Sequence, residues 1–525
     1  MGKVSATGGF RLFIGVATST TIMAVGTIVL ARLMLPEEYG LYSIVLFPSL
    51  MIGLFRDWGV NSAVTKYVAH SRAENNQDDI HDIIVAGLAF EIIVGIALLL
   101  FSLFSASFIA STILHRPEST TLIYIASITI FSGSILTVSQ SAFIGFERMG
   151  LNSLTMICRA IVKSTISPLL VLLGYGALGA VLGYTFSLLT ASTIGFILLF
   201  IIILKKLRKT RTRQPSLVQA LKKMLHYGVP LSISSILAGF MVQFYSLMMA
   251  SFSTDAMIGN YQVSIQFTVL LTFVTAPIAT VLFPAFAKLS SQNEHARALR
   301  ESIFASSIKY SALLLVPATM AVMVLSKPMI STLYGDKWIH APSFLSLLVI
   351  SNLFIVFGTL VYGRFLTGLG ETKMLMKLSL LTLSFGLPLA FILIPPLGIV
   401  GVILGLLFAG LPSTFWGLYW TWKHYGAKAD LKSSAKIFAA SAIAATSTYL
   451  CLIFFNTAEW IRLIVGATVF LSMYIFTAPL IGAVSKSDIN NLRTMLSDLG
   501  VISKLVNIPL TLMEKVANVF SSKSK

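Results

Sequence analysis

Long apolar runs, separated by short polar or charged stretches and by Pro/Gly turns, recur along almost the whole chain. A helix that crosses about 30 Å of hydrocarbon needs roughly 20 apolar residues. Cutting the sequence at its charge clusters and turns gives fourteen such segments, so the pattern predicts an all-α polytopic membrane protein with about fourteen transmembrane helices. The predicted spans are 10–34, 41–63, 83–108, 121–144, 152–173, 178–204, 227–251, 259–284, 302–326, 341–364, 375–394, 398–421, 436–456 and 460–483.

The composition supports a membrane protein. Hydrophobic residues make up 56% of the 525 residues and charged residues only 11%. Soluble domains carry roughly 25% charged residues, so this chain needs lipid as part of its solvent. Its two cysteines, Cys158 and Cys451, lie far apart in apolar runs. The sequence has no Cys/His spacing typical of a zinc site, and we expect neither a metal nor a cofactor.

The formal net charge of +18 could indicate nucleic-acid binding or membrane topology, and the positions of the charges decide between them. Basic residues concentrate in the cytoplasmic loops of membrane proteins. With a cytoplasmic N-terminus, the short outer loops keep only Arg32, Arg116, Lys327, Lys337 and Arg462. We therefore expect a multi-pass cell-membrane protein with both termini in the cytoplasm and no nucleic-acid partner. The most basic inner loop follows the sixth span and holds Lys205, Lys206, Arg208, Lys209, Arg211, Arg213, Lys222 and Lys223.

Three glycine markers recur in the same order in the two halves of the chain. The triplet Gly40-Leu41-Tyr42 of the second span corresponds to Gly259-Asn260-Tyr261 of the eighth, at an offset of 219 residues. A nearly constant offset predicts duplication of a six-helix unit. Because six is even, the two copies share one orientation and leave a cavity between two lobes. The other pairs are Gly145 with Gly368, and Gly176, Gly179 and Gly183 with Gly398, Gly401 and Gly405, at offsets of 223 and 222 residues.

The repeat and the loops predict five regions. In the last one, Ile489, Leu492, Met495, Leu499 and Ile502 recur at three- and four-residue steps. This spacing predicts an amphipathic helix along the cytoplasmic interface, with an anchoring role. The regions are an N-lobe of helices one to six at 1–204, a basic cytoplasmic linker at 205–226, a C-lobe of helices seven to twelve at 227–422, two further helices at 423–483 and the cytoplasmic tail at 484–525.

Several short segments carry a family resemblance. They are residues 32–42 (RLMLPEEYGLY), 57–63 (DWGVNSA) with 66–69 (KYVA), 145–148 (GFER) and 333–338 (LYGDKW). Together they resemble the polysaccharide transporter (oligosaccharide flippase) family of the multidrug/oligosaccharidyl-lipid/polysaccharide superfamily, over roughly residues 8–483, with archaeal members the most similar. The resemblance implies a V-shaped fold of two six-helix lobes that works by alternating access. It also implies, as cargo, a sugar chain on a polyisoprenyl phosphate or pyrophosphate. Two helices beyond twelve also occur in such flippases.

Such a cargo needs cations inside the membrane, because burying its phosphate unpaired is prohibitive. Arg159 and Lys163 are four residues apart in the fifth span, so both lie on one helix face. At about 1.5 Å per residue, Lys163 is roughly 17 Å from the inner end. The alternative for both is snorkelling to the interface. We also expect Lys309 and Arg364 to be cavity cations, although they lie nearer the cytoplasmic ends, where interfacial anchoring is the alternative.

Arg56 is the third principal cation, and its position resembles a cavity-facing arginine of the related lipid II flippases. The alternative is a local pair with Asp57. Glu91 lies roughly 12 Å into the third span. As an intramembrane carboxylate, it could carry a coupling proton or cation, with Asp57 as a second candidate, or simply pair with a nearby cation. The polar side chains that could line a sugar path, or instead form interhelical hydrogen bonds, are Gln140, Gln243, Gln262, Gln266 and Asn352.

We therefore expect a transporter, not an enzyme, that flips a polyisoprenyl-(pyro)phosphate-linked oligosaccharide to the outer leaflet for surface polysaccharide or glycoprotein synthesis. We expect a monomer, with glycan-assembly enzymes as possible partners. One alternative is a cation-coupled multidrug exporter of the same superfamily, and another is a passive channel. The third is an outer-face glycosyltransferase that uses Glu37 and Glu38 as a catalytic acidic pair. However, Pro36-Glu37-Glu38 has the pattern of a helix start, with acids at the positive end of the dipole.

Overall fold

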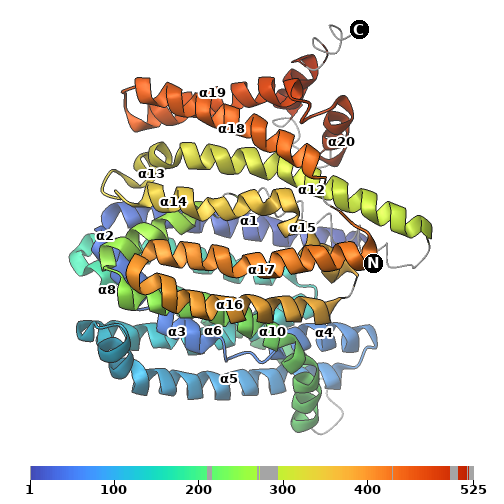
Figure 1. The fold of residues 1–525 in the computed structure, drawn as a ribbon. Helices are drawn as coiled ribbons and strands as arrows, with labels where there is room; N and C mark the ends of the chain where they lie inside the picture. Colours follow the sequence, from blue (N-terminus) through green and yellow to red (C-terminus); the bar gives the residue numbers. More distant parts are fainter. Residues whose placement is uncertain are drawn as a thin grey trace. The chain divides into compact units, whose positions relative to one another are not determined.

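The computed structural model describes residues 2–209, 216–268, 271, 294–369, 371–428, 430–496, 507–516 and 518. Every regular element in these ranges is a helix, as the apolar pattern predicts (Figure 1). The chain divides into two compact units. Unit 1 comprises Met1–Gln262 and Ala390–Val402, and unit 2 comprises Val263–Leu389 and Ile403–Lys525.

Unit 1 holds the first ten numbered α-helices, and α1 packs on α7, α5 on α6, and α6 and α7 on α8. Its largest buried cluster joins α4, α5 and α6 to the end of α8 and the start of α10, with Val64, Ile84 and Phe143 fully buried. The elements are α1 (Gly2–Leu33), α2 (Pro36–Ile44), α3 (Phe47–Gly53), α4 (Val60–Ala73), α5 (Gln77–Phe108), η1 (Ile109–Ile113), η2 (Pro117–Ser119), α6 (Thr120–Gly145), α7 (Met149–Leu170), η3 (Val171–Tyr175), α8 (Gly176–Leu199), η4 (Phe200–Leu204), α9 (Lys205–Lys209) and α10 (Leu217–Phe252).

Unit 2 contains most of the remaining helices. Within it α18 and α19 lie side by side and α12 packs on α18 (Figure 1). A smaller core gathers Phe304, Phe365 and Leu378. The elements are α12 (Glu294–Val324), α13 (Ser326–Tyr334), α14 (Ala341–Val349), η5 (Ile350–Phe357), α15 (Thr359–Gly368), α16 (Thr372–Leu397), α17 (Ile399–Tyr425), α18 (Leu431–Phe454), α19 (Glu459–Leu480) and α20 (Lys486–Leu496), with the part of α16 and α17 from 390 to 402 belonging to unit 1.

Ten helices in the described ranges are long and apolar enough to cross a membrane, or eleven if the bent pair Ala341–Phe357 and Val361–Gly368 counts as one span. The all-helical membrane class is therefore confirmed, whereas the number fourteen is not. The two predicted spans 152–173 and 178–204 correspond to α7 and α8, which follow each other without an intervening loop in the stretch Met149–Leu207, one of these ten, and pack against each other. The chain turns between them at Gly174 and Gly176, which have φ of 90° and 47°.

Two further predicted spans explain the rest of the difference between the fourteen predicted spans and the helices that are long enough to cross a membrane. The span 41–63 is divided among α2, α3 and α4, because a turn at 54–59 interrupts it after Gly53. Most of the span 259–284 lies outside the described residues. The structure therefore corrects the second span from one helix to three short ones, and this break shapes the candidate site.

The first part of the tail is helical. In α20 the side chains of Ile489 and Leu492 are buried, which fits the apolar face of the predicted amphipathic helix. Asn491 Nδ2 donates to the Tyr310 hydroxyl of α12 at 2.7 Å, so this helix packs within unit 2. Leu499 and Ile502, which extend the predicted face, lie outside the described residues.

Candidate functional site

Arg56 leaves the backbone from the turn that breaks the second predicted span. Trp58 and Gly59 both have positive φ, 46° and 77°, and interrupt the helical path before α4 begins at Val60. Asp57 Oδ1 accepts a 2.8 Å hydrogen bond from the backbone N–H of Asn61 and so holds the first turn of α4. The carboxylate of Asp57 therefore serves the helix start, and the local ion pair with Arg56 that we considered as an alternative is not formed.

Arg56 faces Glu91 of α5 instead. Its Nε lies 3.9 Å from Glu91 Oε2, and the Glu91 side chain is fully buried. Asn61 Nδ2 donates to the other carboxylate oxygen, Oε1, at 2.7 Å. Neither Arg56 Nε nor Glu91 Oε2 has a hydrogen-bond partner, because 3.9 Å exceeds hydrogen-bond length. The pair is thus a loose charge contact inside unit 1, as the pairing alternative for Glu91 anticipated.

Gly133 of α6 makes room for the arginine. A Cβ at this position would collide with Arg56 Nη1, so the guanidinium lies directly against the helix backbone. Thr137, one turn further along α6, is 3.4 Å from Asn61 Nδ2. A charged residue from the turn, a carboxylate from α5 and small or polar residues from α6 therefore meet in one interior cluster, formed by Arg56, Asn61, Glu91, Gly133 and Thr137, which we call the Arg56 cluster.

Arg159 and Lys163 lie on one face of α7, as their spacing predicts. Both approach the ring of Tyr184 on α8: Arg159 Cζ is 5.9 Å and Lys163 Nζ 5.3 Å from its centroid. Both side chains are half-buried, and Arg159 Nε has no hydrogen-bond partner. Among the described residues, neither cation forms an ion pair with a carboxylate. Two positive charges on a helix that is long enough to span a membrane therefore lie near one aromatic ring.

The predicted polar path residues divide between the two units. In unit 1, Gln140 Nε2 donates to Thr155 Oγ1 at 3.0 Å and so links α6 to α7, which is the interhelical alternative. The half-buried Gln243 has a side-chain oxygen without a hydrogen-bond partner. Gln262 is the last residue of the first segment of unit 1. Gln266 and Asn352 belong to unit 2 and are half-buried. Whether any of them contacts sugar stays a prediction.

The two remaining predicted cations belong to unit 2. Arg364 is exposed on α15. Lys309 Nζ donates to both carboxylate oxygens of Asp488, at 2.8 and 2.7 Å, which joins α12 to α20. This ion pair favours the anchoring alternative for Lys309. Sequence reasoning did not identify Asp488 as its partner, although its place just before the buried Ile489 marks it as part of the packed face.

A second cluster in unit 1 was also missed. Arg116 Nε donates to Asp255 Oδ1 at 2.6 Å, and its Nη atoms donate to the carbonyl oxygens of Leu114, Ala250 and Ser253 at 2.6, 2.6 and 3.0 Å. The side chain is 13% exposed. The sequence analysis counted Arg116 only as an outer-loop charge. We call Arg116, Asp255 and these three carbonyl groups the Arg116 cluster.

Next to the Arg116 cluster, Gly40, the first glycine marker of the predicted repeat, lies close to Gly259, with which the prediction pairs it. A Cβ on Gly40 would collide with the backbone of Asp255, and one on Gly259 would collide with the Pro36 carbonyl and lie 3.2 Å from Gly40 N. The two segments therefore approach backbone to backbone. The nearby Glu38 Oε2 accepts a hydrogen bond from Leu35 N at 3.1 Å, which satisfies the amide that precedes α2, so the helix start predicted for Pro36-Glu37-Glu38 is confirmed.

A polytopic all-helical chain with cations inside its spans has the design of a multi-pass membrane transporter. A family described as polysaccharide biosynthesis protein matches residues 29–343. The chain belongs to this family, within the multidrug/oligosaccharidyl-lipid/polysaccharide superfamily, which confirms the family resemblance of its motifs.

Two curated relatives are similar over most of their length. An uncharacterized membrane protein of Methanocaldococcus jannaschii is 24% identical over 382 residues, which are 69% of this chain and 73% of the relative. The lipopolysaccharide biosynthesis protein WzxC of Escherichia coli is 22% identical over 397 residues, 74% of each chain.

Solved structures support the fold. The lipid II flippase MurJ in an inward closed conformation matches with a TM-score of 0.70 and 14% identity, covering 89% of this chain and 98% of its own. An inward-facing multidrug resistance MATE family transporter matches with a TM-score of 0.63 and 17% identity, covering 80% and 98%. These families are transporters or flippases.

Proposed function

We propose that this protein flips a polyisoprenyl-(pyro)phosphate-linked oligosaccharide from the cytoplasmic to the outer leaflet by alternating access. The observation that carries the proposal is the pair Arg159 and Lys163, two cations on one helix face with no carboxylate partner in the described residues. An anionic headgroup is the cargo that compensates such charges. The similarity to a lipopolysaccharide biosynthesis protein and to a lipid II flippase points to the same class.

In this mechanism, Arg159 and Lys163 bind the phosphate, and the Tyr184 ring holds both cations in place from α8. Arg56 is the third phosphate ligand. Its contact with Glu91 is 3.9 Å long and lacks a hydrogen bond, so the guanidinium can exchange the carboxylate for phosphate. Removing Arg56 from Glu91 leaves a buried charge, which favours uptake of a proton there. Proton coupling at Glu91, with Asp57 as the second candidate, is thus part of the proposal.

Alternating access needs two lobes, and the proposal includes the architecture predicted from the repeat: fourteen helices, lobes at 1–204 and 227–422, and cytoplasmic termini. The Arg116 cluster and the contact between Gly40 and Gly259 then join the two proposed lobes at their outer ends. In that orientation, these contacts must separate before the cargo is released outward. A ligand shifts such an equilibrium only by its different affinity for the two states.

A cation-coupled drug exporter is the second candidate, and one observation favours it. Glu91 is a fully buried carboxylate whose Oε2 has no hydrogen-bond partner. Such a group suits a coupling ion or a cationic substrate as well as a proton. The unpaired cations on α7 favour the anionic cargo over this alternative, since they would repel a cationic drug.

The test is mass spectrometry of membrane lipids from the source organism with the gene deleted. We expect one complete polyisoprenyl-linked glycan to accumulate. Wild type should restore the normal level, and Arg159→Ala/Lys163→Ala should not. Lys205→Ala, which removes an exposed cation from α9, is the matched control and should complement. Full complementation by the double variant would refute the phosphate role, and accumulation of a truncated glycan would indicate a transferase.

A further inference from the structure

An open pocket of about 600 Å³ lies in unit 1, where the turn at 54–59 faces α10. Sites for small ligands commonly have volumes of roughly 300–1,000 Å³, so the space suits a small polar molecule or one ring of a larger one. Its polar and aromatic lining residues are Asp57, Trp58 and Ser62 from the turn and the start of α4, and Ser232 and Ser235 from α10.

Two close contacts hold α10 against this turn. A Cβ on Gly59 would collide with the Gly228 carbonyl, so these glycines meet backbone to backbone. A Cβ on Gly239 would lie 2.6 Å from the Leu54 side chain. The two contact points on α10 are eleven residues apart, which is about 16 Å along a helix. The residues of α10 that line the pocket lie between them. The pocket is thus preformed, which lowers the ordering cost of binding.

Trp58 presents an aromatic ring to this pocket. The residue is 38% exposed, and its indole N–H donates to no residue in the described ranges. Its φ of 46° lies in the left-handed region, which a bulky residue rarely adopts and glycine adopts freely. Strained residues of this kind cluster at active sites and ligand clamps. An exposed tryptophan in a strained backbone conformation therefore indicates a role for its ring surface.

Hydrogen-bonding groups surround the ring. Asp57 Oδ1 holds the backbone N–H of Asn61 at 2.8 Å, whereas Oδ2 accepts from no group in the part of the chain that the structure describes. The Ser232 hydroxyl donates to a backbone carbonyl at 3.0 Å and keeps its lone pairs as acceptors. Ser62 and Ser235 are exposed. The pocket thus combines one aromatic face with a carboxylate oxygen and three hydroxyl groups.

We propose that this pocket binds one pyranose ring of the cargo, with Trp58 stacked on the ring's C–H face and Asp57 Oδ2 accepting from its hydroxyl groups. The inference rests on the proposed function, in which Arg56 binds the phosphate. Arg56 and Trp58 are two positions apart, so their Cα atoms are at most about 7 Å apart. One turn would then hold the phosphate and the sugar next to it, which leaves Glu91 as the first coupling candidate.

A cationic ligand is the other chemistry that an aromatic ring and a carboxylate suit. Sites for quaternary ammonium groups are aromatic cages, built from several rings. Trp58 is the one aromatic residue among the described residues that line this pocket. The neighbouring Arg56 also adds positive charge, which disfavours a cation. The three hydroxyl groups instead match a ligand with many hydroxyl groups of its own.

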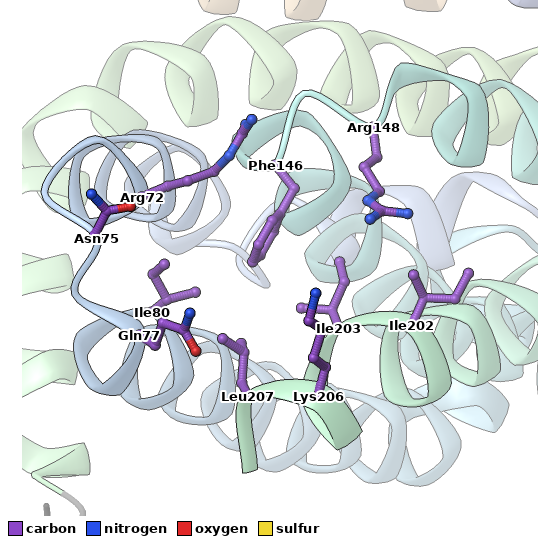
Figure 2. A pocket seen from close by; sticks show the side chains of 10 residues that line it. All are labelled: Arg72, Asn75, Gln77, Ile80, Phe146, Arg148, Ile202, Ile203, Lys206 and Leu207. Atoms are coloured by element: carbon purple, nitrogen blue, oxygen red, sulfur yellow. The ribbon is translucent and has the colours of Figure 1, made fainter. Parts of the chain in front are cut away.

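Another pocket of unit 1, drawn in Figure 2, lacks this combination. None of its described lining residues carries a carboxylate or a hydroxyl group. Its aromatic residue, Phe146, packs against the main apolar core of the unit. We therefore assign the sugar to the pocket at the turn and not to this one.

Saturation-transfer NMR on the full-length protein in phosphatidylcholine nanodiscs tests the assignment, because these contain no sugar detergent. The probes are the methyl glycosides of glucose, galactose, mannose and N-acetylglucosamine. We expect at least one to bind saturably, with the strongest saturation on the protons of one ring face. Trp58→Leu should weaken this binding about tenfold, and Trp58→Phe, which keeps an aromatic face, should weaken it less.

Two further variants complete the design. Asp57→Asn keeps an oxygen for the Asn61 N–H and loses the charged acceptor, so it should also weaken binding about tenfold. The matched control is Trp460→Leu, which removes another exposed tryptophan, at the start of α19 in unit 2. It should bind like wild type. Each variant is compared only if its unfolding temperature equals that of wild type, and Asp57→Asn serves if Trp58→Leu does not fold.

Three results would overturn the proposal. The first is that folded wild type binds none of the four glycosides saturably. The second is that Trp58→Leu and Asp57→Asn bind them as wild type does. The third is that tetraethylammonium binds with the same dependence on Trp58 and Asp57 and the glycosides do not, which would make the pocket a cation site.

Failure of this proposal is distinguishable from failure of the proposed function. The glycosides contain neither phosphate nor lipid, so their binding does not depend on flipping. Glycoside binding at Trp58 together with an unchanged lipid pool after gene deletion would keep the sugar site and refute the flippase. Accumulation of the lipid-linked glycan without glycoside binding would do the reverse.

Discussion

Arg116 and Asp255 form an ion pair at 2.6 Å although 139 positions separate them in the sequence. The same guanidinium also donates to three carbonyl oxygens, two of them, from Ala250 and Ser253, around the end of α10. One side chain thus fixes the end of α10 against the turn between α5 and α6. Because these donors and acceptors are mostly removed from water, their loss has measurable consequences.

Replacing Arg116 by alanine should destabilise the protein by about 1–3 kcal/mol, because the Asp255 carboxylate and the carbonyl groups lose a charged donor. Thermal unfolding in detergent measures this change. Arg116→Ala/Asp255→Ala should recover part of the loss, since the carboxylate left alone is then also removed. Strictly additive effects of the two single variants would mean that the contact has no energetic coupling.

Alanine at Gly40 or Gly259 should lower the free energy of unfolding by about 1–3 kcal/mol. Each new Cβ would collide with backbone atoms, which cannot move aside as the end of a flexible side chain can. The matched control is Gly363→Ala in α15, where a Cβ meets nothing within 4 Å. There the helix should gain about 0.5–1 kcal/mol. Equal unfolding temperatures for Gly40→Ala and Gly363→Ala would contradict the close approach.

Arg56→Gln should destabilise unit 1 by about 2 kcal/mol or more, because it leaves the Glu91 carboxylate buried without its counter-charge. Arg56→Gln/Glu91→Gln should be more stable than the single variant. In lipid-flipping assays with the proposed cargo, both variants should lose activity. Glu147→Gln, at an exposed carboxylate paired with Arg72, controls for loss of a surface ion pair and should be mild in both measurements.

The contact between α12 and α20 should weaken at acid pH. Burial acts to raise the pKa of Asp488, but hydrogen bonds from Lys309 and Ser485 outweigh it and hold this pKa below its ordinary value. The ion pair therefore contributes its full stability above the unfolded-state pKa of about 3.9 and loses it as the pH falls through the lower folded value.

Hydrogen exchange of α20 between pH 6 and pH 3 should therefore show loss of protection at the acid end only, after correction for the intrinsic exchange rate. Asp488→Asn should reduce protection throughout this range and remove the pH dependence. A wild-type helix whose corrected protection is constant down to the lowest pH would exclude this ion pair as its anchor.

Much of the fold follows from the sequence because apolar periodicity and length determine membrane helices directly. Local sequence patterns also predicted the family motifs, the shared helix face of Arg159 and Lys163 and the helix start at Pro36. The break at 54–59 was not, because its turn depends on positive φ at Trp58 and Gly59 inside an apolar stretch. A hydropathy pattern contains no signal for such an interruption.

The sequence also did not predict which groups pair with the charged residues. Sequence spacing can relate Arg56 to its neighbour Asp57, but the group that faces it is Glu91, on another helix. Likewise, Lys309 and Asp488 are 179 positions apart, and Arg116 and Asp255 are 139 apart. Such pairs arise from tertiary packing, which a single sequence does not specify.

The contact between Gly40 and Gly259 bears on how such a chain could arise. A half-length ancestor that paired with its own copy about a two-fold axis would present the same glycine from both subunits, an isologous contact. Each mutation of that codon would then have altered both sides of the contact at once. In a chain formed by fusion of two such copies, the two glycines are encoded separately, so each half can vary without changing the other copy. Their mutual contact still requires that neither gains a side chain.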